Sequence, residues 1–424
     1  EEDSHDNNNR IGPYDDNYFG QPVKPEMVIK NPLGQEISNG GFFVFESPLT
    51  TATTFHFVVS NPGNAQLNFD YELTVPPQYH ATVTISGDDA DAFTYNNDLS
   101  IKVPMQGNES FSIKYDGSCS GSAICIVTLH LNEFDMDDYT FAIIHSECNI
   151  QNPSTNDITT TEQWDDWRVL NEHQIIKDGG QLTITGHVGI PEGINIFVED
   201  RGELIIDGGH LTNACNALWT GIEIHGSDNF SQLSGTPGKV KVINGGIIEH
   251  AVCGIRTGEE IIGGYEPSAG IVQAYGGIFK DNISDIWLHP YQNFNPVTEE
   301  PANNLSRFKS SEFITTQSFY NFTGSPTLGD HINLYQVEGV LFKGNTFKNI
   351  AITNGEYRGT GIFSASAGFY GYNECAVPNT TPCPEYYISR FQHLDYGIMV
   401  LDDRESLPIV IDSATFTDNK RGIL

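Results

Sequence analysis

A unit centred on a Gly-Ile pair recurs along the second half of the chain. Most copies stand about 25 to 35 residues apart. Ahead of each pair come an alternating strand, a corner and a second short strand, as in KVINGGIIEHAVCGIRTG (241–258). The pairs lie at Gly221-Ile222, Gly254-Ile255, Gly361-Ile362, Gly397-Ile398 and Gly422-Ile423, with Asp285-Ile286 as a variant. The fold of this region must therefore repeat a three-strand unit.

Three short strands per unit at this spacing predict a β-solenoid. A single coil cannot bury its own inward side chains, so it must stack on neighbours about 4.8 Å away. The pair Gly245-Gly246 is then a corner where a side chain would collide with the next coil, and Gly254 begins the third strand. The alternative is a second sandwich, but sandwich strands do not repeat a three-part unit in this way.

The first part of the chain, from about residue 21 to 148, lacks this repeat. It holds alternating runs such as TTFHFVVSN, in which Phe55, Phe57 and Val59 alternate before the break at Pro62-Gly63. About seven short runs of this kind, each ended by a turn residue, predict a β-sandwich.

Three turns in this first part carry a family resemblance. Their matching residues are Asn61, Gly63, Asn64 and Leu67, then Gly87, Asp89, Ala90 and Phe93, then Gly107, Ser110 and Phe111. This series resembles the choice-of-anchor D family and its ASH-like relatives, which are immunoglobulin-like modules of secreted and surface proteins. Gln106 stands where that family favours proline. The resemblance implies a spacer or anchor domain without catalytic residues.

A second resemblance covers the start of the repeat region. The run QLTITGHVGIPEGINIFVEDRGELIIDGGHLTNACNALWTGIEIHG (181–226) is similar to right-handed parallel β-helix regions of large secreted surface proteins of the Bacteroidota. We therefore expect an all-β protein with an immunoglobulin-like β-sandwich followed by a right-handed parallel β-helix.

The expected domain boundaries follow from composition and pattern. Residues 1–20 are an acidic, Asn-rich flexible tail, 21–148 the sandwich, 149–165 a Thr/Asn/Pro-rich linker, and 166–424 the β-helix. Because the sequence ends on NKRGIL, inside a GI strand, we expect the β-helix to be truncated at its C-terminal end. The chain would then be the N-terminal part of a larger protein.

The charge balance limits the partners. Against 55 acidic residues stand 21 basic ones, which gives a net charge of −34. Such a chain should repel nucleic acid, anionic membranes and, without calcium, acidic polysaccharides. No apolar run approaches the ~18 residues of a membrane span, so membrane insertion is not expected. No cofactor is predicted, and the metal content is left open: Asp3, Asp6, Asp15 and Asp16 could bind Ca²⁺, but they lack a recognisable loop spacing.

Seven cysteines indicate the compartment. Cys119 and Cys125 bracket one short polar loop, and Cys375 and Cys383 bracket another. We predict both pairs to be disulfides, which places the protein outside the cell or at its surface. The alternative is buried free thiols. The pairing of Cys148, Cys215 and Cys253 is left open.

Long insertions follow the GI strands at 226–238, 258–269, 289–331, 364–384 and 401–406. If all leave after the same strand, stacking should project them from one edge of the solenoid. Their rings either pack the loops onto the helix or form a contact surface for a glycan or protein. The predicted binding residues are Phe313, Phe319, Tyr320, Phe322, Phe369, Tyr370 and Tyr372.

Catalytic patterns of polysaccharide-degrading β-helices are mostly missing. Of the polygalacturonase-like motifs only Asp402-Asp403 occurs. Charged residues such as Glu249, Lys280 and Arg256 lie on coils, yet no acid cluster recurs at one coil position with a basic partner. We therefore expect no enzyme, but a secreted or cell-surface structural and adhesive protein. The alternatives are a polysaccharide lyase or glycoside hydrolase, and a self-associating subunit of an extracellular filament.

Overall fold

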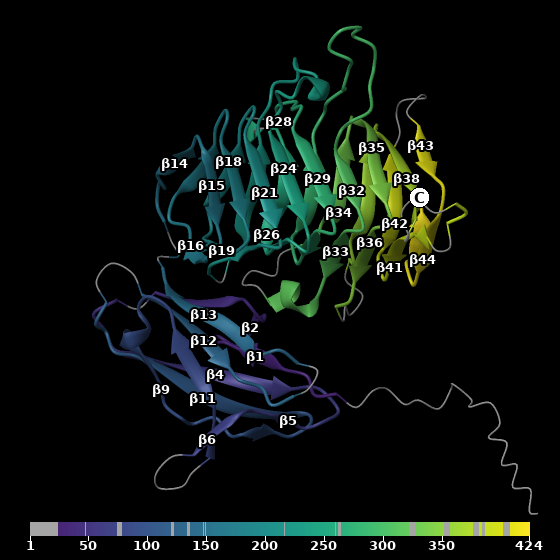
Figure 1. Ribbon diagram of the computed structural model, residues 1–424. Coiled ribbons are helices and arrows are strands. Elements are labelled where there is room, and N and C mark those ends of the chain that lie inside the picture. Colours follow the sequence, from purple (N-terminus) through teal and green to yellow (C-terminus); the bar gives the residue numbers. More distant parts are fainter. Residues whose placement is uncertain are drawn as a thin grey trace, which may run out of the picture.

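The computed structural model shows two all-β units, a sandwich and a solenoid (Figure 1). It describes residues 24–424 except 47, 74–78, 120–122, 134–135, 147, 149, 216, 259, 262–263, 322–326, 352–356, 376–380, 384–385 and 402–407. The predicted tail at 1–20, Phe322 and Asp402-Asp403 lie outside the described residues. The described helices are the 3-10 turns η2 (Ala90–Ala92), η3 (Gln232–Ser234) and η4 (Gln317–Asn321). None of them is long and apolar enough to cross a membrane.

The sandwich packs two main sheets face to face. The first has the order β2-β1-β4-β11-β9 and the second β3-β13-β12-β8. Their strands are β1 (Val28–Lys30), β2 (Glu36–Ile37), β3 (Phe42–Phe45), β4 (Thr53–Asn61), β8 (Val83–Ser86), β9 (Phe93–Tyr95), β11 (Gly107–Tyr115), β12 (Ile124–Leu129) and β13 (Tyr139–His145). Two small pairs join β5 (Leu67–Asn68) to β10 (Lys102–Val103) and β6 (Tyr71–Leu73) to β7 (Tyr79–Ala81).

Strand alternation produces the sandwich core as the sequence predicts. Phe55, Phe57 and Val59 of β4 are buried, and the Phe57 ring stacks on Phe111 of β11 with centroids 5.3 Å apart. Strand β3 is half-buried at Phe42 because that side of the strand faces the solenoid rather than the sandwich core.

Three parallel sheets form the solenoid, and in the described part of the chain they have ten, nine and nine strands. The first sheet contains β14 (Thr155–Ile158), β17 (His173–Ile176), β20 (Asn195–Val198), β23 (Trp219–Ile224), β26 (Ala251–Thr257), β31 (Ser284–Leu288), β34 (Asp330–Tyr335), β37 (Thr360–Ala365), β42 (Tyr396–Leu401) and β45 (Arg421–Ile423). All the Gly-Ile pairs and the Asp285-Ile286 variant lie in this sheet, so the predicted parallel β-helix is confirmed.

The other two sheets complete each coil. The second contains β15 (Thr161–Trp164), β18 (Gln181–Ile184), β21 (Glu203–Asp207), β24 (Lys239–Ile243), β29 (Ile271–Tyr275), β32 (Arg307–Lys309), β35 (Glu338–Lys343), β38 (Gly368–Tyr372) and β43 (Ile409–Ile411). The third contains β16 (Trp167–Val169), β19 (His187–Ile190), β22 (His210–Asn213), β25 (Ile247–Glu249), β30 (Ile278–Lys280), β33 (Glu312–Thr315), β36 (Thr346–Asn349), β41 (Ser389–Gln392) and β44 (Ala414–Thr417). Hairpins β27 (Glu260–Ile261)–β28 (Gly264–Tyr265) and β39 (Glu374–Cys375)–β40 (Tyr386–Tyr387) branch from the corners.

Inward side chains of neighbouring coils stack in ladders. The longest aromatic ladder runs through the third sheet and comprises Phe279, Phe313, Phe347, Phe391 and Phe416. Successive ring centroids are 4.7–5.0 Å apart with nearly parallel planes, which is the spacing of hydrogen-bonded strands. The rings therefore stack because the parallel strands hold equivalent residues of neighbouring coils in register.

Corners explain the recurring glycines. At Gly245-Gly246, Gly245 has φ of 79°, and a Cβ on Gly246 would meet the carbonyl oxygen of Ile206 at 2.5 Å. The left-handed φ and the close approach of the preceding coil both favour glycine. The predicted corner at Gly245-Gly246 is therefore confirmed, and so is the predicted collision of a side chain there with a neighbouring coil.

Two boundaries differ from the sequence prediction. β14 and β15 pair in parallel with β17 and β18, so coil strands begin at Thr155, within the expected linker 149–165. The expected insertion 289–331 contains β32 and β33, and 364–384 contains β38. The longer connections consequently leave different corners: 289–306 follows the first sheet, 316–329 the third and 373–388 the second. The prediction of one common edge is wrong.

The disulfides are only partly those predicted. Cys375–Cys383 is confirmed. Cys119 and Cys125 are free thiols, because β12 directs Cys125 into the sandwich core, where it is fully buried. A second disulfide joins Cys148, just after the sandwich, to Cys215 of the solenoid. Cys253 is a buried free thiol.

Candidate functional site

The predicted binding rings are largely core residues. Phe313 and Phe369 lie on β33 and β38 with their side chains inside the solenoid, and Phe319 of η4 is fully buried. They cannot contact a ligand, so their assignment as surface residues is wrong. Tyr320 is half-buried against the Phe319 ring. The remaining described members, Tyr370 and Tyr372, lie on the outer face of the second sheet.

A concavity lies between the sandwich and the third sheet of the solenoid. This interdomain cleft has a volume of about 660 Å³. Its lining includes Glu36, Phe42 and Glu46 from the sandwich, and His210 and Glu249 from the solenoid. Figure 1 shows the third-sheet strands β16, β19 and β33 on the side of the solenoid that faces the sandwich.

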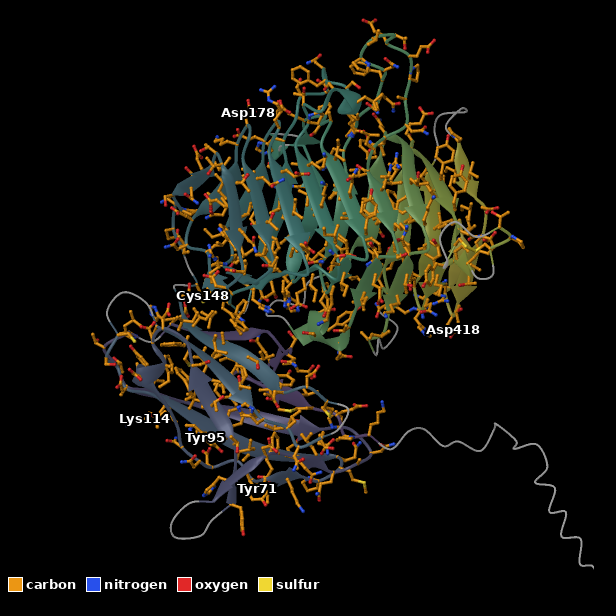
Figure 2. All side chains as sticks on the ribbon, viewed as in Figure 1. Tyr71, Tyr95, Lys114, Cys148, Asp178 and Asp418 are labelled. Atoms are coloured by element: carbon orange, nitrogen blue, oxygen red, sulfur yellow. A yellow bond between two sulfur atoms is a disulfide. The ribbon has the colours of Figure 1, made fainter. Side chains whose placement is uncertain are left out.

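Close contacts hold the two units together around this cleft. Gly189 of β19 lets the Phe42 ring pack closely against the solenoid, because a Cβ at this position would lie only 2.5 Å from the ring. Trp167 Nε1 donates a hydrogen bond to the carbonyl oxygen of Gly40 at 3.1 Å. The Cys148–Cys215 disulfide closes the same junction, where Figure 2 labels Cys148.

A buried ion cluster forms the solenoid side of the cleft. Glu249 of β25 and Lys280 of β30 are in register on neighbouring coils. Lys280 Nζ donates to Glu249 Oε2 at 3.1 Å, and His210 Nε2 lies 2.8 Å from Glu249 Oε1. Trp219 Nε1 also donates to the Glu249 backbone carbonyl at 2.8 Å. Both carboxylate oxygens of Glu249 are therefore occupied.

A second layer continues from this cluster along the corner. His250 Nδ1 lies 2.9 Å from Thr212 Oγ1, and His250 Nε2 lies 3.9 Å from Asp281 Oδ2. Asp281 accepts from the Thr316 backbone N–H at 2.6 Å and from Thr316 Oγ1 at 2.7 Å. His250 and Asp281 have left-handed φ values of 59° and 54° at equivalent corners, a conformation that His and Asp adopt more readily than most residues.

Burial and charge together set the protonation of this cluster. Burial alone would raise the pKa of Glu249, but Lys280, His250 and His210 reverse this and hold it well below its ordinary value. Glu249 in turn raises the pKa of Lys280. Burial lowers the pKa of His250 to about 4 and raises the pKa of Asp281 to about 6. At neutral pH the cluster thus holds an ionised Glu249–Lys280 pair and a neutral His250.

The chemistry available to this cluster is limited by its own contacts. A general acid or base must reach a substrate proton at hydrogen-bond distance. The two carboxylate oxygens of Glu249 contact His210 and Lys280, and both carboxylate oxygens of Asp281 accept hydrogen bonds from Thr316. The arrangement therefore suits a structural ion network beneath the sandwich better than proton transfer.

The sequence contains a partial signal for this cluster. Each unit ends its second short strand with two polar residues, Glu249-His250 in one coil and Lys280-Asp281 in the next. Glu249 pairs with Lys280 and Glu223 with Arg256 in register. These are single acid–base pairs on neighbouring coils, and neither is an acid cluster that recurs at one coil position. His210 carried no such signal, since Ile247 occupies its position in the following coil.

Metal ligands do not converge in this region. Within the described ranges, no three His, Cys, Asp or Glu side chains form a group that could hold a metal ion. The four acidic tail residues considered for Ca²⁺ lie outside those ranges.

Comparisons with known proteins give little further guidance. No protein-family model and no curated protein sequence matches this chain. One solved structure that matches is described as a protein of unknown function from Porphyromonas gingivalis W83. It is 11% identical, with a TM-score of 0.22, over 31% of this chain and 51% of that one. The chain thus spans about half of that structure, and a likeness of this strength carries no argument about fold or function.

Acidification is expected to destabilise the folded chain between about pH 6.5 and 4. Burial lowers the pKa of His187, His250 and His289 to about 4, so the unfolded chain takes up these three protons first. Asp281, with its pKa raised to about 6, acts in the opposite direction but supplies one proton only. The net difference of about two protons corresponds to a steepest loss of ~2–3 kcal/mol per pH unit.

Urea unfolding followed by tryptophan fluorescence at pH 7.5 and 5.5 measures this effect. The His250→Asn variant, which keeps a residue suited to the left-handed corner, should show a shallower pH dependence than the parent chain. Equal stability at the two pH values, or an unchanged slope in the variant, would refute the assignment.

Proposed function

We propose that this protein is a secreted or cell-surface structural and adhesive protein without catalytic activity. The observation that carries the proposal is the Cys148–Cys215 disulfide, which ties the sandwich to the solenoid. Disulfides persist in oxidising compartments outside the cytosol. With Cys375–Cys383 it supports an extracellular location.

The architecture supports a mechanical and adhesive role. Each coil packs only on its neighbours, and one continuous core of stacked Ile, Val, Leu and Phe side chains runs through the solenoid. Such a body is stiff along its axis and offers long flat outer faces. The choice-of-anchor D resemblance of residues 21–148 fits a spacer or anchor, and the Bacteroidota-like run at 181–226 fits a surface protein.

A polysaccharide-degrading enzyme is the second candidate. The specific observation in its favour is an acid–base pair, Glu249–Lys280, of which Glu249 lines a cleft of about 660 Å³. Against it stands the occupation of both Glu249 oxygens by protein groups.

Two measurements test the proposal. Non-reducing peptide mapping of protein secreted by an expression host should recover Cys148–Cys215 and Cys375–Cys383 as linked peptides. Incubation with a panel of neutral and acidic polysaccharides should give binding without release of unsaturated uronates or reducing ends. Product release that is abolished by Glu249→Gln would favour the enzyme instead and place its site in the cleft.

A further inference from the structure

Basic side chains are concentrated on the outer face of the second sheet, although the chain as a whole is strongly acidic. Lys309 of β32 and Lys343 of β35 are in register on neighbouring coils. Arg307 lies two residues before Lys309 on the same face of β32 and is exposed. Within the described residues, Arg307 has no acidic partner at ion-pair distance. We call Arg307, Lys309 and Lys343 the basic strip.

Tyrosines flank the basic strip along the solenoid axis. Tyr275 of β29 is in register with Lys309, and Tyr372 of β38 with Lys343. The resulting row is Tyr275, Lys309, Lys343 and Tyr372, on four successive strands spaced about 4.8 Å apart. Tyr275 and Tyr372 are 38% and 37% exposed. The row runs across the sheet that contains the labelled strands β29, β32, β35 and β38 in Figure 1.

The β39–β40 hairpin adds two more tyrosines beside this row. Tyr386 and Tyr387 are 51% and 49% exposed. The hairpin is closed by Cys375–Cys383. It rests against the corner after Lys343, where a Cβ on Gly344 would meet the Tyr387 Cβ at 2.8 Å. The confirmed disulfide thus holds an aromatic hairpin beside the basic strip.

We propose that the basic strip and its flanking tyrosines bind a linear acidic polysaccharide that runs along the solenoid axis. This inference rests on the proposed adhesive function and names its ligand class. Lys and Arg supply attraction to carboxylates, and tyrosine faces supply flat apolar area for sugar rings. A single-file row on a flat sheet matches an extended polymer better than a folded protein, which would need a broader surface.

The net charge of −34 does not prevent such binding. At physiological ionic strength the Debye length is about 8 Å, so charges elsewhere on the molecule are largely screened from a ligand on this face. Arg307, Lys309 and Lys343 lie within about that distance of one another, because adjacent strands are ~4.8 Å apart and alternate residues ~7 Å.

The test measures binding of polygalacturonate to the full chain in EDTA. The triple variant Arg307→Gln, Lys309→Gln, Lys343→Gln should bind at least about 10-fold more weakly, as expected for the loss of three ion contacts on the outer face of the sheet. The matched control is Lys24→Gln, Lys102→Gln, Lys114→Gln, which changes the net charge equally at exposed positions of the sandwich. It should change the Kd by less than about 2-fold. Tyr275→Ala with Tyr372→Ala should weaken binding while leaving the melting temperature nearly unchanged.

Four results would overturn the inference. The first is that both triple variants weaken polygalacturonate binding equally, and the second is that this binding requires Ca²⁺. The third is that oligothymidylate binds as tightly as polygalacturonate or more tightly, and the fourth is that only the methyl-esterified, uncharged polymer binds. The last result would leave the adhesive function intact with a different ligand. Absence of binding to every polysaccharide and protein surface would instead contradict the proposed function itself.

Discussion

Replacing Glu249 with alanine is expected to lower the free energy of unfolding by about 3–5 kcal/mol. The substitution leaves Lys280 and His210 beneath the sandwich without their common acceptor. The Glu249 and His210 side chains are each only 6% exposed, so water has little access to the contact that they lose. Urea unfolding of the parent and the variant at pH 7.5 measures the difference.

The matched control is Glu312→Ala on the same sheet. Glu312 also pairs with a lysine, since Lys348 Nζ donates to its Oε2 at 3.0 Å, but its side chain is 46% exposed. An exposed pair of this kind contributes about 1 kcal/mol or less. If Glu249→Ala costs no more than Glu312→Ala, the cluster is not a structural element.

A double substitution separates the contribution of the ion pair to the free energy of unfolding from the contribution of side-chain packing. Replacing Glu249 with leucine and Lys280 with methionine removes both charges while keeping apolar volume in the wall. Buried ion pairs can often be exchanged for apolar residues at little net cost, because the desolvation penalty disappears with the charges. Much of the stability lost in Glu249→Ala should therefore return in this double variant.

The solenoid was predictable wherever its corners carry glycine. Gly245-Gly246 and Gly276-Gly277 mark the same corner in successive coils, and the Gly-Ile strand follows at a regular distance. Both glycines have a physical cause at this corner, a left-handed φ at the first and a close carbonyl at the second of Gly245-Gly246. The pattern in the sequence therefore reflects the geometry directly.

The prediction failed where the same corner uses other residues. Ser310-Ser311 stands at the corner between β32 and β33, and Ser310 adopts a φ of 49° without being glycine. With no glycine pair to mark it, the coil from Arg307 to Thr315 is predicted from the sequence as part of an insertion. The sequence therefore predicts Phe313 as a surface ring, although strand register places it in the core.

The candidate sites could be predicted only in part, because they depend on register and on domain contact. Alternation along a strand assigns a face, but only the number of residues in each coil decides which charges become neighbours. Lys309 and Lys343 are 34 residues apart in sequence order and adjacent in space for that reason. The cleft also depends on the contact between Phe42 and Gly189. This contact joins the two domains, so no local sequence pattern in either domain predicts it.

Phe313→Ala is expected to destabilise the solenoid by about 3–5 kcal/mol. The Phe313 ring is fully buried and stacks on Phe279 at 5.0 Å and on Phe347 at 4.7 Å. Its removal leaves a cavity between two rings that the fixed strand spacing cannot close, since the backbone ladders hold the coils apart. Thermal or urea unfolding of the variant measures the loss.

Phe416→Ala, in the same aromatic ladder, is the control for Phe313→Ala. Phe416 is half-buried and stacks on Phe391 at 5.0 Å, so it has one stacked neighbour in the ladder where Phe313 has two. In a solenoid whose stability is a sum over neighbouring coils, this substitution should cost clearly less, about 1–2 kcal/mol. Hydrogen exchange should show the Phe313 variant losing protection first in β30, β33 and β36, the strands that carry the interrupted stack. Equal costs for the two variants, or a loss of protection confined to the sandwich, would contradict the assignment of this ladder as the element that couples the coils.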